Sequence, residues 1–147
     1  MKRLMNKIAI VTGASRVMGI GTAICRELAK EGADIFFTHW SNYDRQMEYF
    51  IDDDSVWSQH LMEEIRSFGV RCESMELDLS QPDAPRKLLD EVNERLGSPS
   101  ILVNNATYLA AAENDKFEFY ITLQGVTTLT YYSDRNASAV ITVFKFD

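Results

Sequence analysis

The stretch that decides the fold is Thr12-Gly13-Ala14-Ser15-Arg16-Val17-Met18-Gly19-Ile20-Gly21. Residues 7–12 read Lys-Ile-Ala-Ile-Val-Thr, a short apolar run typical of a central strand in a parallel sheet. After the glycines the apolar residues recur at helical spacing, and Gly32 is placed to end the helix. The sequence therefore predicts a strand, a glycine-rich turn and a helix whose apolar face carries Ile20, Ala23, Ile24 and Leu28.

A turn of this kind predicts a cradle for a nucleotide phosphate. Glycine has no side chain, so the backbone can approach a pyrophosphate closely, and the amides at the helix start carry partial positive charge toward it. The turn is not a Walker loop, because no Gly-Lys-Ser or Gly-Lys-Thr follows, and the chain has no Gly-x-Ser-x-Gly nucleophile elbow. On the turn alone, an ordinary strand-to-helix connection remains the alternative.

Strands and helices alternate through the first 106 residues. Further strands are expected over 34–38, 70–77 and 100–104, and helices over 55–68 and 83–96. The residues expected to face inward from these helices are Val56 or Trp57, Leu61, Ile65 and Phe68 in the first, and Leu88, Leu89, Val92 and Leu96 in the second. Such alternation requires right-handed crossovers and predicts an α/β fold with a Rossmann-like, doubly wound parallel sheet. We expect one domain over 1–147, strand order 3-2-1-4, and residues 140–146 as a fifth strand beside 100–104.

Three motifs carry a family resemblance. Thr-Gly-Ala-Ser-Arg precedes Gly-Ile-Gly, Asp78-Leu79 closes the third expected strand, and Asn104-Asn105-Ala106 follows the fourth. In this order they resemble the signatures of the short-chain dehydrogenase/reductase family, including its 3-oxoacyl-acyl-carrier-protein reductase-like members. The resemblance spans residues 7–106, the cofactor-binding half of the family fold. Two departures are Val17-Met18, which lengthen the glycine loop, and Thr107, which stands where the family usually has glycine.

The resemblance implies a nicotinamide dinucleotide as cofactor and partner. We expect its pyrophosphate over the glycine turn, its adenine near Asp78 and Leu79, and the ribose beside nicotinamide near residues 104–106. An NAD site usually carries a carboxylate at the end of the second strand, about 20 residues after the glycines. Residues 38–41 read Thr-His-Trp-Ser without one, whereas Arg16 could pair with a 2′-phosphate, so we expect NADP, with NAD as the alternative. The cofactor-binding residues expected are Gly13, Ser15, Arg16, Gly19, Ile20, Gly21, His39, Asp78, Leu79, Asn104, Asn105 and Ala106.

The catalytic signature of the family is not found in this chain. The family uses Tyr-x-x-x-Lys, in which lysine lowers the pKa of a tyrosine that passes a proton to or from the substrate oxygen. No tyrosine here is followed by lysine four residues later, and Tyr131 with Arg135 comes nearest. We therefore predict no catalytic residue. We also predict no metal site, because Asp52-Asp53-Asp54 is typical of a solvated helix cap.

Residues 107–147 diverge from the family pattern. The family places a long helix here, and residues 119–129 match it weakly, with Leu123 where asparagine is usual. The abundance of Phe, Tyr, Ile, Val and Thr favours strands instead. Two interpretations stay open: a truncated, NAD(P)-binding portion of an oxidoreductase that is inactive alone, or a non-catalytic nucleotide-binding or interaction module.

Composition limits which classes of binding partner and which cellular compartment we expect. The net charge of −7 argues against nucleic acid or an anionic membrane as partner, and no apolar stretch reaches the length of a membrane span. The chain has two cysteines, Cys25 and Cys72, which we expect to be buried thiols in a reducing, cytoplasmic environment. Because the resemblance covers only part of the family fold, we expect under-covered apolar surface and association into a homo-oligomer.

Overall fold

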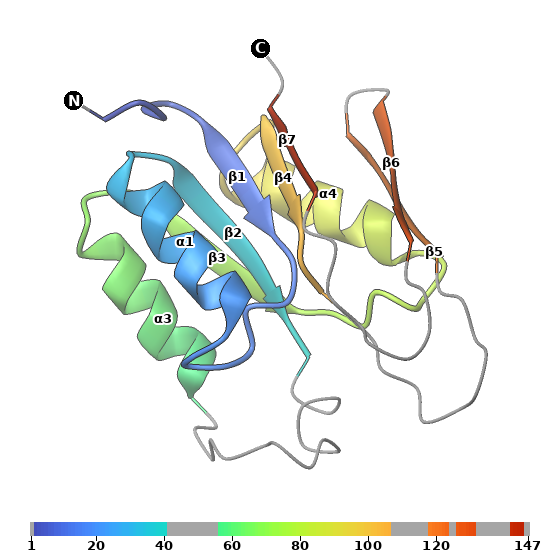
Figure 1. Ribbon diagram of the computed structural model, residues 1–147, viewed down its shortest axis with the longest axis horizontal. Coiled ribbons are helices and arrows are strands. Elements are labelled where there is room, and N and C mark those ends of the chain that lie inside the picture. Colours follow the sequence, from blue (N-terminus) through green and yellow to red (C-terminus); the bar gives the residue numbers. More distant parts are fainter. Residues whose placement is uncertain (1, 41–55, 107–117, 124–125, 132–141, 146–147) are drawn as a thin grey trace.

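The computed structural model describes residues 2–40, 56–106, 118–123, 126–131 and 142–145, which include a five-stranded sheet of order β3-β2-β1-β4-β7 (Figure 1). The first four strands of the chain pair in parallel with β1 between β2 and β4. This confirms the predicted Rossmann-like order 3-2-1-4. The strands are β1 (Ile8–Val11), β2 (Asp34–His39), β3 (Cys72–Glu76), β4 (Ile101–Asn104) and β7 (Thr142–Lys145).

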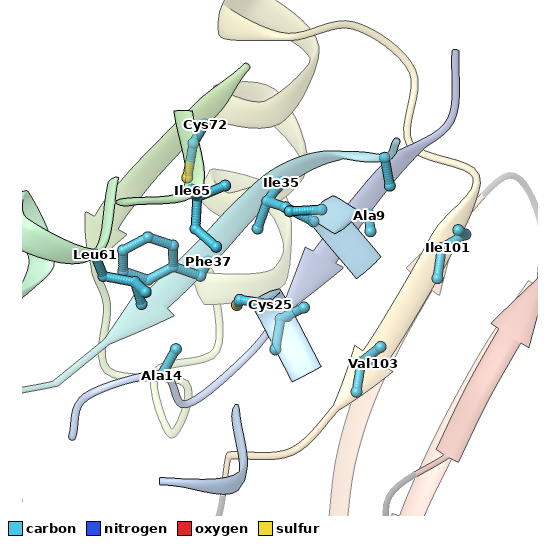
Figure 2. Close-up of a cluster of buried hydrophobic side chains, with 13 residues drawn as sticks. Ala9, Ala14, Cys25, Ile35, Phe37, Leu61, Ile65, Cys72, Ile101 and Val103 are labelled. Atoms are coloured by element: carbon cyan, nitrogen blue, oxygen red, sulfur yellow. The ribbon is translucent and has the colours of Figure 1, made fainter. Parts of the chain in front are cut away.

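Helices cover both faces of this sheet. Figure 1 shows α1 (Ile20–Lys30) and α3 (Trp57–Arg66) in front of the sheet and α4 (Ala84–Arg95) behind it. Alternate strand residues face the two layers, so Phe37 packs with α1 and α3 while Phe36 packs with α4. Figure 2 shows the larger of the two buried clusters, which contains Ala9, Ala14, Cys25, Ile35, Phe37, Leu61, Ile65, Cys72, Ile101 and Val103.

The predicted inner face of α1 was wrong in part. Ile20 is 57% exposed and Ala23 is exposed, although Ile24 and Leu28 pack partly against the core. The positions that meet the sheet are instead occupied by small side chains, because this helix packs on β1 and β2 close to the glycine turn. The buried residues of α1 are Gly21, Thr22, Cys25 and Ala29.

The other two helices follow their patterns closely. In α3, Leu61 and Ile65 are fully buried and Trp57, rather than the 45% exposed Val56, packs against the same cluster. In α4 the expected inner residues all belong to the second cluster, where Leu89 is partly buried and Leu88, Val92 and Leu96 are buried.

The carboxyl-terminal third departs from the expected topology. β7 lies beside β4 as predicted, but it pairs antiparallel, so the parallel arrangement expected for the fifth strand was wrong. A parallel strand needs a crossover connection of about a dozen residues or more, usually a helix. The segment in which the family expectation places that helix instead forms β5 (Glu118–Leu123) and β6 (Val126–Tyr131), an antiparallel pair that contacts α4 through β5. The strand-favouring composition was therefore the better guide.

Both cysteines are buried free thiols, as expected. Burial raises the pKa of the Cys25 thiol strongly and that of Cys72 to about 12, so both stay protonated. Within the described ranges, no helix is long and apolar enough to span a bilayer. The large apolar side chains exposed in the described parts are Met5, Met18, Ile20 and Val56, and none of them belongs to α4 or β4. Self-association and a cytoplasmic location stay predictions.

Candidate functional site

The predicted cofactor residues gather at one edge of the sheet. The glycine turn follows β1, His39 ends β2, Asp78 and Leu79 follow β3, and Asn104 ends β4. Because these strands are parallel, their carboxyl ends meet at the same edge. The chain turns from one side of β1 to the other between β3 and β4, and the crevice at such a switch point is where open α/β sheets bind ligands.

The first part of the glycine turn is held against β2. The Gly13 amide donates to Thr38 Oγ1 at 3.2 Å, and the Ala14 amide donates to the Thr38 carbonyl at 2.9 Å. Gly13 has φ +79°, and a Cβ there would lie 2.7 Å from Ala106 Cα. Any side chain at this position would therefore separate the turn from the end of β4.

The second part of the turn leads into the amino terminus of α1, which has no side-chain cap. The Arg16 carbonyl accepts from the Gly19 amide at 3.1 Å and from Thr22 Oγ1 at 2.6 Å, which closes the loop that contains Val17 and Met18. Gly19 is the N-cap of α1, no side chain caps this end, and the first turn carries no acidic residue. The first amides of the helix therefore present their partial positive charge at the sheet edge without a competing side-chain acceptor.

A network of hydrogen bonds around Thr12 and Asn105 joins β1 to β4 beneath the turn. Thr12 Oγ1 accepts from the amides of Asn105 and Ala106, each at 3.0 Å, and donates to the Val103 carbonyl at 3.4 Å. Asn105 Nδ2 donates to the carbonyls of Thr12 and Gly13, each at 3.1 Å. The Gly13 carbonyl oxygen is thus occupied by a hydrogen bond from Asn105, on the inner side of the turn.

Asn104 has a different environment from its neighbour. It is 5% exposed, and its Nδ2 has no hydrogen-bond partner among the described residues. Strand alternation places it on the face of Leu102, which packs with α4. Asn104 and Asn105 therefore point to opposite sides of β4, and of the two only Asn105 belongs to the hydrogen-bond network around Thr12.

The residues after β3 form a second, self-contained turn. Asp78 Oδ1 accepts from the Ser80 amide at 2.9 Å and from Ser80 Oγ at 2.6 Å, while Oδ2 accepts from Gln81 Nε2 at 3.1 Å. Burial on its own raises the pKa of the Asp78 carboxyl, but the hydrogen bonds from Ser80 and Gln81 outweigh it and hold the pKa below its usual value. Asp78 is thus a charged residue that orders the backbone leading into Leu79.

At the end of β2, the turn and the strand are linked once more. Ser15 Oγ accepts from the Trp40 amide at 3.1 Å, and the His39 ring lies 6.2 Å from that of Phe37 at an interplanar angle of 51°. Sequence reasoning missed Thr12, Thr38 and Trp40 as supporting residues. The available signal was a threonine at the end of each of two otherwise apolar strand segments.

Comparison with known proteins agrees with this architecture. The short chain dehydrogenase family model matches residues 7–124. The chain belongs to the short-chain dehydrogenase family. It is 37% identical over 146 residues to the Uncharacterized oxidoreductase YjdA of Bacillus subtilis, a match that covers 99% of this chain and 51% of that protein. It is also 33% identical over 102 residues to a 3-oxoacyl-[acyl-carrier-protein] reductase of Staphylococcus epidermidis, with 69% and 36% covered.

A solved structure shows the same likeness. A blue fluorescent protein from a metagenomic library, crystallised in complex with NADPH, is 35% identical and has a TM-score of 0.61 over 74% of this chain and 39% of that chain. The short-chain dehydrogenase chain described here thus spans about half the length of YjdA and about a third of the reductase's.

Tyr131 ends strand β6 rather than lying on a helix, and Arg135 lies outside the described residues. Asp52–Asp54 lie outside them too. Within the part of the chain that the structure describes, no group of three His, Cys, Asp or Glu side chains could hold a metal ion. The absence of a catalytic residue stays a prediction.

Proposed function

We propose that this chain binds a nicotinamide dinucleotide, with NADP preferred to NAD, as the cofactor-binding portion of a short-chain dehydrogenase-type oxidoreductase. The observation that carries the proposal is the glycine turn, which sets the uncapped amino terminus of α1 beside the carboxyl ends of β1 and β4. In that arrangement the pyrophosphate lies over residues 13–21, beside the first amides of α1, which have no side-chain cap. The NADPH complex of the similar blue fluorescent protein supports the same class of ligand.

The residues present fit such a cofactor. Gly13, Gly19 and Gly21 let the turn pack closely on Ala106, Arg16 and Asn105, and Asn105 holds the Gly13 carbonyl within the protein. Asp78 and Leu79 border the place of the adenine, and residues 104–106 border that of the second ribose. When bound, the nicotinamide would supply or accept a hydride, and this chain's own residues would bind and orient it.

The preference for NADP is proposed on the charges at the end of β2. His39 and Trp40 occupy the place where a carboxylate would accept a hydrogen bond from the ribose 2′-hydroxyl, and Arg16, which is exposed, supplies a guanidinium from the neighbouring turn. Titration of the full chain with NADP and with NAD tests this. We expect tighter binding of NADP, and in Arg16→Ala a loss of roughly tenfold or more for NADP alone, as for one charge-assisted hydrogen bond.

Lys30→Ala is the matched control for that experiment. It removes one positive charge at the far end of α1, where Lys30 pairs with Glu27 at 2.7 Å on the surface, and it should leave both affinities unchanged. Equal affinities of the wild-type chain for NADP and NAD, or an Arg16→Ala protein that keeps a preference, would refute the assignment. If neither nucleotide binds, the proposed function itself is wrong.

Catalytic competence does not follow from cofactor binding. Without a Tyr-x-x-x-Lys pair, we propose that the chain alone does not turn over carbonyl or alcohol substrates at rates usual for the family, since loss of a positioned general acid costs roughly a hundredfold to ten-thousandfold. An assay of nicotinamide absorbance with a panel of ketones, aldehydes and alcohols checks this. Robust turnover that is abolished by Tyr131→Phe or Tyr132→Phe would identify a tyrosine acid and contradict the proposal.

A further inference from the structure

The end of β2 has no carboxylate, but the neighbouring strand β3 places one beside it. His39, the last residue of β2, is the register partner of Glu76, the last residue of β3. The pairing continues one step further, because the Leu77 amide donates to the His39 carbonyl at 3.0 Å. Adjacent strands are about 4.8 Å apart, so the backbone of Glu76 is one strand spacing away from the residue that occupies the ribose-binding position.

Glu76 and His39 share a face of the sheet. On β2, Ile35 and Phe37 both belong to the cluster under α1 and α3, so His39, two residues further, lies on that side. On β3, Cys72 belongs to the same cluster, and Ser74 Oγ donates to Met62 Sδ of α3 at 3.4 Å. Glu76 continues this series and is exposed. Side chains directly opposite one another on neighbouring strands are in contact range.

This face is also the one on which the glycine turn lies, because Ala14 belongs to the cluster under α1 and α3 and the turn leads into α1. The Gly13 and Ala14 amides both bond to Thr38, and the Trp40 amide bonds to Ser15, so the turn and the end of β2 are one unit. A nucleotide placed over this turn would bring its 2′-substituent to the end of β2, between the turn that carries Arg16 and the strand that carries Glu76. Two side chains of opposite charge therefore flank that substituent.

From this geometry we propose that Glu76 is a specificity-determining residue, whose carboxylate favours a ribose 2′-hydroxyl and opposes a 2′-phosphate. The inference rests on the proposed function, because it concerns the same nucleotide site. A carboxylate accepts a hydrogen bond from a hydroxyl, whereas it repels a phosphate that carries negative charge. Arg16 acts in the opposite direction, so the site keeps NADP ahead of NAD by a moderate margin and admits both.

The decisive variant is Glu76→Gln, which keeps the size and polarity of the side chain and removes its charge. Full chains are titrated with NADP and NAD, and with 2′,5′-ADP and 5′-AMP as fragments that differ only in the 2′-phosphate. We expect the affinity of Glu76→Gln for NADP and 2′,5′-ADP to rise about three- to tenfold, as for removal of one like charge near a protein surface, with NAD unchanged or weaker. High salt should reduce the difference.

Glu94→Gln is the control, because it removes one carboxylate from the exposed carboxyl-terminal turn of α4 and should leave the NADP-to-NAD ratio unaltered. Glu76→Lys should raise the ratio further than Glu76→Gln, and far-ultraviolet circular dichroism verifies that each variant is folded. If both nucleotides bind and neither Glu76 variant changes the ratio, the inference is overturned while the proposed function stands. If the wild-type chain binds neither nucleotide, both are overturned.

Discussion

Replacement of Gly21 by alanine tests whether close packing in the glycine turn outweighs the higher helix propensity of alanine. Gly21 is the second residue of α1, and intrinsic helix propensity alone would make alanine more stable there by up to about 1 kcal/mol. The surroundings oppose this gain. A Cβ at Gly21 would lie 2.6 Å from Asn105 Nδ2 and 2.6 Å from the Gly13 carbonyl oxygen. The first atom ends a side chain that two hydrogen bonds hold in place, and the second belongs to the backbone.

The expected magnitude follows from what must move. If the Asn105 amide shifts, its two hydrogen bonds to the Thr12 and Gly13 carbonyls weaken, at about 1 kcal/mol each. Overpacking against the turn adds about 1–3 kcal/mol. After the propensity gain of about 1 kcal/mol is subtracted, the net loss in the free energy of unfolding is about 2–4 kcal/mol. This is a large fraction of the roughly 5–15 kcal/mol that stabilises a typical domain.

Urea unfolding followed by tryptophan fluorescence and by circular dichroism measures the difference. Gly69→Ala is the first control: its φ is +84°, but nothing lies within 4 Å of a Cβ there, so only the backbone strain of about 1–2 kcal/mol is expected. Ala23→Gly, at an exposed position of the same helix, should cost about 1 kcal/mol. A Gly21→Ala protein as stable as wild type, with an unchanged denaturant slope, would refute the interlock of the turn, α1 and Asn105.

Two further predictions concern polar groups at the same edge. Thr12→Val should lower the free energy of unfolding by about 2–4 kcal/mol, because the amides of Asn105 and Ala106 lose their acceptor; Thr12→Ser should recover most of this, and equal losses in the two variants would contradict the role of the hydroxyl. Asp78→Asn should destabilise the fold at neutral pH, since hydrogen bonds depress the pKa of the folded carboxyl. Stability of this origin is present above the unfolded pKa and lost as the pH falls through the folded one, so the difference from wild type in acid titrations should shrink below about pH 3.9, and a difference independent of pH would refute it.

Local patterns predicted most of the fold because they are read over short distances. The apolar run before Thr12 and the periodic leucines of α4 each need fewer than a dozen residues to be recognised, and both elements form where expected. Strand order followed from the crossover rule once the alternation of strands and helices was clear. The face of α1 was mispredicted because side-chain size, and not hydrophobicity, decides which residues fit against the turn, β1 and β2.

Failures in the carboxyl-terminal third have a different origin. The family expectation of a helix conflicted with β-branched and aromatic residues on both sides of Gly125, and the local preference prevailed in β5 and β6. The direction of β7 then depended on what connects it to the earlier strands. Composition could indicate a strand, but it could not indicate that the strand runs antiparallel to β4.

The site depends on contacts that no short segment encodes. Thr12 and Asn105 are 93 positions apart, yet their hydrogen bonds determine which backbone groups of the turn face the ligand. Register has the same character: a shift of β3 by one residue would carry Glu76 to the face of α4 and replace it beside His39 with an apolar neighbour, Met75 or Leu77. The motifs therefore locate the cradle, while the pairing of β2 with β3 determines the charge that a nucleotide's 2′-substituent would meet. On the proposal made above, cofactor preference depends on two strands, and a search confined to the glycine turn and the end of β2 finds Arg16 but misses Glu76.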